Sequence, residues 1–336
     1  MNIKKIGLTA LAASLVSVSS ANAGEITASG AASMTVENYS SVLRDAGVAY
    51  SMADSVTLSG SGELDNGLTV SMSFELDSDN PSGSSYDNKS VSISSEELGT
   101  LTLAGHGGSS AVSAIDATAA GDIFDTFDTK VGVGASGTAT TAETSSATGD
   151  AAMITTAAGD NSFMYTLPSM VDGLSVSASY APQGSGDESS SAFAGTFTGV
   201  EGLSVSYGIG TNNSAEGTAL DGDVASMKAS YAFGPLTVAY SDHEFDSNTA
   251  SRDQDVTSYS IAYTVSDELS ITYGTETFDS GESATVDAEY AKISVAYTSG
   301  GMTLTAVAAE GENISFTTAA AEDVDYWGLT AAFAFY

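Results

Sequence analysis

The segment Leu269-Ser-Ile-Thr-Tyr273 alternates apolar residues with small polar ones. A period of two places successive side chains on opposite sides of an extended chain. The apolar residues of this segment therefore share one face of a predicted β-strand, and its Ser and Thr share the other. Such a strand separates an apolar environment from a polar one.

The same alternation recurs along the chain at regular distances. Copies begin at Leu68, Leu101, Leu174, Leu203, Leu236, Leu269 and Met302, so successive starts lie 33, 73, 29, 33, 33 and 33 residues apart. A unit of about 33 residues accommodates two strands of roughly 10 residues, one short turn and one longer loop. The single interval of 73 exceeds the common interval of 33 by 40 residues. One loop, between Gly105 and Asn161, is therefore far longer than the others.

A short turn rich in Gly, Asn and Asp precedes each copy. The turns are Leu64–Gly67, Glu96–Gly99, Pro168–Gly173, Gly199–Gly202, Phe233–Pro235, Val265–Glu268 and Ser299–Gly301. These residue types supply the positive φ that tight hairpins demand. A second strand before each turn makes seven hairpins, and Glu25–Tyr39 and Val324–Tyr336 add a first and a last strand. The pattern predicts an all-β, sixteen-stranded antiparallel transmembrane barrel, with seven short turns on one side and eight longer loops on the other.

Aromatic residues support a membrane location for this barrel. Tyr165, Phe197, Phe233, Tyr263 and Tyr297 lie at or just before the short turns. A ring of aromatic side chains at one level is typical of the girdle where a barrel meets the membrane interface. The general enrichment of Tyr and Phe in strands is the alternative explanation.

The first 23 residues have the features of a secretory signal peptide. Lys4 and Lys5 precede an apolar run from Ile6 to Val18, and Ala21-Asn22-Ala23 fits the small-x-small cleavage pattern. Removal of 23 of the 336 residues leaves 313, the predicted barrel from Gly24 to Tyr336. The chain contains no Cys, so an exported protein of this kind is held together without disulfides.

The net charge of −35 becomes −37 when the leader removes its two lysines. Phosphate backbones require Lys and Arg, so the charge excludes nucleic acid as a partner and favours cations. No residue is predicted to be catalytic and no cofactor is expected. Ser and Asp are too abundant for a triad pattern to be informative.

With its leader, repeat, one long loop and aromatic C-terminus, the chain resembles the general-diffusion porins of Gram-negative bacteria. It is most similar to the sixteen-stranded trimeric alphaproteobacterial type. The resemblance implies a homotrimer in the cell outer membrane and a third external loop, here Gly107 to Asp160, that folds inward as a constriction. Ala334-Phe335-Tyr336 resembles the C-terminal signal that the barrel-insertion machinery reads.

The candidate residues of the pore constriction are charged side chains of the long loop and of the polar strand faces. They are Asp116, Asp122, Asp125, Asp128, Lys130, Glu75, Lys228 and Lys292. The spacing of three in Asp122-Ile-Phe-Asp125-Thr-Phe-Asp128 places the carboxylates along one side of a helical turn. Phe124 and Phe127 would then pack on the wall. A solvated acidic loop is the equally open alternative.

Two features depart from the family pattern. Basic residues are few, and we expect Arg44 and Arg252 in loops, so a dense basic cluster on the wall is not expected. In the last strand Trp327, Leu329, Phe333 and Phe335 share one parity and Tyr336 has the other, which leaves the facing of this strand open.

Two other functions remain open at this point. One is a substrate-specific porin, and the other is an acidic surface-layer or adhesin-type β protein. Asp-rich segments such as Asp242–Asp246 suit Ca²⁺, although no EF-hand pattern is present. From the charge balance we predict a cation-selective channel for passive diffusion of small hydrophilic solutes.

Overall fold

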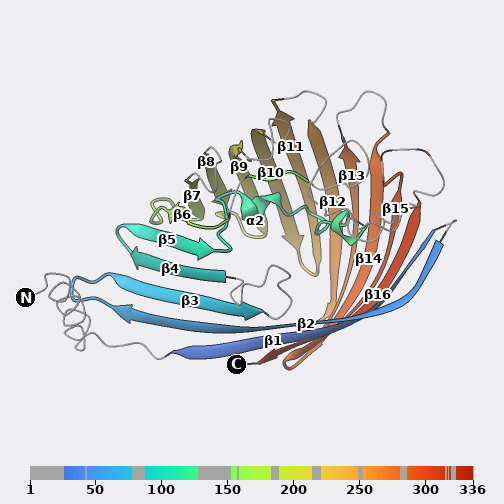
Figure 1. Cartoon of the computed structure of the whole chain (residues 1–336), viewed down its shortest axis with the longest axis horizontal. Helices are drawn as coiled ribbons and strands as arrows, with labels where there is room; N and C mark the ends of the chain where they lie inside the picture. Colours follow the sequence, from blue (N-terminus) through green and yellow to red (C-terminus); the bar gives the residue numbers. More distant parts are fainter. Residues whose placement is uncertain are drawn as a thin grey trace, which may run out of the picture.

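The computed structural model describes residues 26–41, 44–77, 88–127, 153–156, 159–182, 189–213, 221–248, 253–280, 286–314, 316, 318 and 323–335. Within these ranges the chain forms sixteen antiparallel strands that close into one barrel (Figure 1). Neighbouring strands follow chain order, and β1 (Thr27–Ser41) pairs with β16 (Val324–Phe335) to complete the ring. The predicted barrel and its strand number are confirmed.

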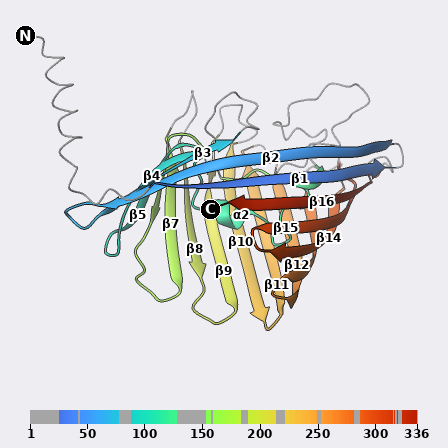
Figure 2. The same cartoon turned by 90° about the horizontal axis from the view of Figure 1, so that it is seen from below.

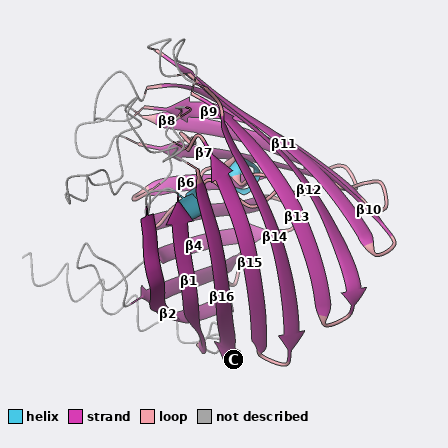
Figure 3. Cartoon of the chain, turned by 90° about the vertical axis from the view of Figure 1, so that its right-hand side faces the viewer, coloured by secondary structure: helices cyan, strands magenta, loops and turns pink. Residues whose placement is uncertain are grey.

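The remaining strands cross the barrel wall in regular alternation (Figure 3). Their bounds are β2 (Arg44–Glu63), β3 (Thr69–Asp77), β4 (Asn88–Ser95), β5 (Gly99–His106), β6 (Ser162–Thr166), β7 (Leu174–Ala181), β8 (Ser190–Phe197), β9 (Leu203–Asn212), β10 (Gly222–Phe233), β11 (Leu236–Ser247), β12 (Gln254–Ser266), β13 (Leu269–Asp279), β14 (Ala288–Ser299) and β15 (Met302–Glu312). No helix in the described ranges is long and apolar enough to cross a membrane.

All seven predicted short turns connect the strands that the repeat assigned to them. Gly67 and Gly99 show why glycine occurs there, because their φ angles are +79° and +77°. At residue 99 a side chain would also meet the backbone oxygen of Thr166. A side chain is therefore disfavoured by the backbone angle at both positions, and at residue 99 by the lack of space as well.

The opposite end of the barrel differs from the prediction at its first connection. Only residues 42 and 43 separate β1 from β2, so this connection is not a longer loop. Ser41 pairs with Arg44, because the two strands continue to pair as far as the connection. Arg44 therefore begins β2, and its expected loop position is wrong. The long β1 and β2 lie side by side in Figure 2.

The apolar residues of the repeat lie on the outer face of the barrel. Val238, Ile271 and Tyr273 are 44%, 37% and 48% exposed. Trp327 and Phe335 of β16 are also exposed, which assigns the apolar parity of the last strand to the outer face. The aromatic residues before the short turns are exposed as well, as an interfacial girdle requires.

Candidate constriction site

The connection between β5 and β6 lies against the inner wall of the barrel. In Figure 1 its short helix α2 (Ser113–Asp116) is within the space that the strands enclose. At the neck of the loop, His106 Nδ1 lies 2.6 Å from Asp160 Oδ1. The Gly107 N–H donates to the same oxygen at 3.2 Å. The described parts, 107–127, 153–156 and 159–160, confirm that this third external loop folds inward.

Aromatic contacts attach one side of the loop to the wall. The ring centroid of Phe124 lies 5.7 Å from that of Phe278 on β13, edge to face. Phe127 stacks on Tyr290 of β14 with 5.6 Å between centroids. Both loop rings are buried. The predicted packing of Phe124 and Phe127 on the wall is therefore confirmed.

Inward-facing serines attach the backbone of the loop. Their hydroxyl oxygens accept from loop amides, Ser179 from Ala111 at 2.8 Å, Ser241 from Ala119 at 2.7 Å and Ser258 from Ala120 at 2.9 Å. The polar face of the repeat thus supplies acceptors to backbone amides of an irregular segment. Buried backbone groups of the loop acquire partners that the loop itself does not supply.

Glu276 of β13 is the principal acidic anchor. Its side chain is 2% exposed, accepts a hydrogen bond from the Thr118 hydroxyl and accepts another from the Phe124 amide at 3.0 Å. A buried carboxylate requires such donors, because burial without them costs several kcal/mol. Glu276 therefore fixes the position of the loop between these two residues.

The two candidate lysines of the wall also contact the loop. Lys228 Nζ donates to the backbone oxygen of Ala117 at 2.8 Å, and Lys292 Nζ donates to that of Gly121 at 2.9 Å. Their predicted inward orientation is confirmed. Both ammonium groups are held at the loop backbone, on neighbouring parts of the same segment.

A buried polar cluster joins both limbs of the loop to β10 and β11. Ser226 Oγ lies 2.6 Å from Asp116 Oδ1 and 2.8 Å from His243 Nδ1. His243 Nε2 lies 2.8 Å from the backbone oxygen of Ile154, which only accepts, so Nε2 donates. Burial raises the pKa of the Asp116 carboxyl above its usual range.

The cluster of Asp116, Ser226 and His243 needs one proton in addition to those on Ser226 Oγ and His243 Nε2. The Ser226 hydroxyl has one hydrogen but makes two short contacts, to Asp116 and to His243. The second contact requires a proton on the Asp116 carboxyl or on His243 Nδ1. Besides the proton on His243 Nε2, Asp116 and His243 must therefore hold one more proton between them, and the fully hydrogen-bonded cluster is then neutral or an internal ion pair.

Three of the predicted acids meet at one hollow. Asp116, Asp122 and Asp125 line a cavity of about 280 Å³ with Met153 and other loop residues. Asp122 accepts from the Thr118 amide at 2.7 Å and has a φ of +47°, so it precedes the helical turn instead of belonging to it. The expected helical alignment of the acids is wrong at this residue. Its cause is the local bond to Thr118, which competes with helix formation.

The other candidates lie elsewhere. Glu75 is on β3, where its carboxylate accepts from Asn88 Nδ2 at 2.8 Å, and it does not line the acidic hollow. Asp128 and Lys130 fall outside the described residues, as does Arg252. The described part of the chain contains no group of three or more His, Cys, Asp or Glu that could hold a metal ion.

Comparison with known proteins identifies the family. A family model described as Gram-negative porin matches residues 7–335. The chain belongs to this family. It is therefore an outer-membrane porin channel, and neither its family nor its fold is that of an enzyme. The rival interpretation as a surface-layer or adhesin-type protein does not fit this membership or the closed barrel.

Solved porin structures share the fold of this porin. A porin refined at 1.8 Å resolution is 18% identical, with a TM-score of 0.61. A multiply substituted variant of the Rhodopseudomonas blastica porin is 14% identical, with a TM-score of 0.62. A protein from work on asymmetric conductivity of engineered proteins is 16% identical, with a TM-score of 0.63. Each comparison covers 93% of this chain and 100% of the other. No curated protein matches this porin.

Sequence reasoning missed several residues that hold the loop of this porin. Ser226 and His243 were not expected at the site, and neither was Gln254, whose side-chain oxygen accepts from the Ile154 amide at 2.8 Å. Strand parity could have predicted that His243 faces inward, because it lies an odd number of residues from the outward-facing Val238. Its partner on the loop could not be read from the strand pattern.

Proposed function

We propose that this porin is a cation-selective channel for passive diffusion of small hydrophilic solutes. The observation that carries the proposal is the hollow on the inward-folded loop, where Asp122 and Asp125 supply the negative charge beside the buried Asp116 cluster. Acidic side chains at a narrow aqueous site raise the local concentration of cations and repel anions. We take this segment as one side of the constriction.

The distribution of basic groups supports the same selectivity. Lys228 and Lys292 donate to loop carbonyls, so their ammonium groups lie where the loop meets the wall. Glu75 and Glu276 add acids to the inner face. The net charge of −35 gives the whole molecule a negative field. The proposal requires no cofactor, and calcium binding forms no part of it.

A reversal-potential measurement tests the proposal. The refolded channel is placed in a planar bilayer with a KCl gradient, first at low and then at high salt. Exposed charges are screened beyond about 8 Å at 0.15 M salt and about 3 Å at 1 M. We therefore expect a potential on the cation side that decreases as salt rises. A potential near zero or on the anion side at low salt contradicts the proposal.

A pair of variants locates the charges responsible. Replacing Asp122, Asp125 and Asp128 together with Asn should reduce cation preference even at high salt, because charges at a constriction act at short range. Glu289, Glu310 and Asp325 are exposed acids on the outer wall. Neutralising them removes the same charge outside the ion path and serves as the matched control. Equal effects of the two triple variants would assign selectivity to the overall field.

We propose further that the working molecule is a homotrimer inserted after cleavage near Ala23. The support is the resemblance to trimeric porins and the outward row of apolar residues on β16, which includes Leu329 and Phe335. The insertion machinery would read this strand. Light scattering of the detergent-purified protein gives the oligomeric state, and the N-terminal sequence of the exported protein gives the cleavage site.

A further inference from the structure

An apolar groove lies on the outer wall over β3 to β6. Its volume is about 500 Å³, and Phe74, Val91, Leu103 and Phe163 contribute one side chain from each strand. Val91 pairs with Leu103 and Leu103 pairs with Phe163, so these side chains form a row across adjacent strands. Val91 and Phe163 are 38% and 39% exposed. The groove therefore opens away from the pore.

Lys89 borders this groove at the loop end of β4. It shares the parity of Val91 and Ile93, both exposed on the outer face, and pairs with Phe74 of β3. Its aliphatic stem lies over Gly105, where a Cβ would be 2.8 Å from Lys89 Cε. Within the described residues, no hydrogen bond or ion pair engages its ammonium group. Glycine on β5 thus leaves room for a long cationic side chain beside an apolar groove.

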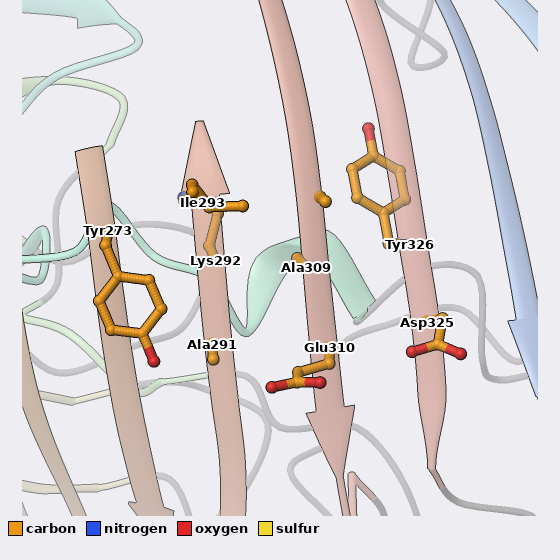
Figure 4. A pocket seen from close by; sticks show the side chains of 9 residues that line it. Tyr273, Ala291, Lys292, Ile293, Ala309, Glu310, Asp325 and Tyr326 are labelled. Carbon is orange, nitrogen blue, oxygen red and sulfur yellow. The ribbon is translucent and has the colours of Figure 1, made fainter. Parts of the chain in front are cut away.

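The outer wall at β15 and β16, which β1 and β2 separate from β3, has the opposite charge. Glu310 of β15 and Asp325 of β16 are paired neighbours, and Figure 4 shows their side chains next to each other. They line a hollow of about 340 Å³ with Tyr273. Lys228 and Lys292 point inward to the loop. Among the lysines whose side chains the structure describes, Lys89 is thus the one on the outer face.

We propose that this groove binds a membrane lipid with a phosphorylated headgroup. The phosphate would contact the Lys89 ammonium, which extends toward the interface because a lysine in hydrocarbon is costly. An acyl chain would lie along Val91 and Leu103 and continue toward Ile93 and Leu101, which extend the apolar row. From Lys89 to Ile93 the strand rises about 13 Å, roughly half of an outward apolar band about 25 Å tall. The acidic wall of β15 and β16 would repel the same headgroup.

Native mass spectrometry of the refolded porin in detergent tests this site. The probes are dimyristoyl phosphatidic acid and dimyristoyl phosphatidylcholine, which share their acyl chains. We expect the porin to retain more phosphatidic acid than phosphatidylcholine. Lys89→Met should reduce retention of phosphatidic acid by about five-fold, the effect of one lysine near a membrane surface, and leave phosphatidylcholine unchanged. Lys292→Met removes the same charge from the inner face and should change neither.

A second variant tests the apolar part of the groove. Val91→Trp fills the groove and should lower retention of both lipids, and heat-modifiable migration in detergent gels verifies that each variant folds. Equal retention of both lipids by the unaltered porin overturns the proposal, as does unchanged retention in Lys89→Met. Protection of Lys89 from an aqueous amine reagent in lipid-free trimers would show instead that a second copy of the chain covers the groove.

Discussion

Replacing Glu276 with Ala should release part of the loop from the wall. The change removes the acceptor of the Thr118 hydroxyl and of the Phe124 amide. Hydrogen bonds to a charged group contribute about 1.5–3 kcal/mol each, and desolvation of the buried carboxylate offsets some of this. We take about 3 kcal/mol, which raises the undocked population of the segment about a hundred-fold. Ser258 and Lys228 remain as anchors, so we expect local opening and not complete release.

Hydrogen exchange and channel recording measure this opening together. The Phe124 amide should exchange about a hundred-fold faster in Glu276→Ala, and single-channel currents should become noisier. Glu276→Gln keeps one acceptor oxygen, so its exchange rate and current noise should lie between those of Glu276→Ala and those of the unaltered porin. Glu289→Ala removes an exposed acid from the adjacent strand and serves as the control. If exchange at Phe124 and current noise are the same in Glu276→Ala as in the unaltered porin, Glu276 does not anchor the loop.

Two further predictions concern pH and the wall. Because burial raises the pKa of Asp116, its contribution to stability is fully present below the unfolded pKa and is lost as pH rises through the raised folded value. Asp116→Asn, followed by urea unfolding in detergent at several pH values, should remove this loss, and an unaltered pH profile would contradict the assignment. Arg at the outward-facing Ile271 should destabilise the barrel by about 2–4 kcal/mol, whereas Arg at the inward-facing Thr272 should be tolerated, as refolding equilibria in lipid would show. Equal costs at the two sites would mean that the two faces are misassigned.

The barrel could be predicted because its determinants are local and repeated. Alternation such as that of Leu269–Tyr273 reveals the two faces of a strand, and turn residues such as Gly67 mark where strands end. Parity then placed Lys228 and Lys292 inside without any knowledge of their partners. The first connection was missed because β1 and β2 continue to pair up to residues 42 and 43, and no turn signal marks that point.

The contacts of the loop depend on the course of an irregular segment, and its sequence has no repeating pattern from which that course could be predicted. Phe124 and Phe127 could be expected to pack on the wall because they are apolar and regularly spaced. The link from His243 to the Ile154 carbonyl, by contrast, joins a strand to a backbone atom 89 residues earlier. A backbone carbonyl has no sequence signature. Such contacts follow only from the three-dimensional course of the loop.

The pairing of β1 with β16 has a consequence for the order of assembly. Thr35 and Thr330 are 295 residues apart in sequence, and their hydroxyl oxygens are 2.9 Å apart in the closed barrel. Contacts of such high sequence separation carry a large entropy of chain closure and slow folding. Before β16 is synthesised and paired, β1 and β15 each present an unpaired edge, which invites association with other chains. The unfinished chain must therefore be shielded until its last residues are available, and losing that strand would leave an open sheet with two reactive edges.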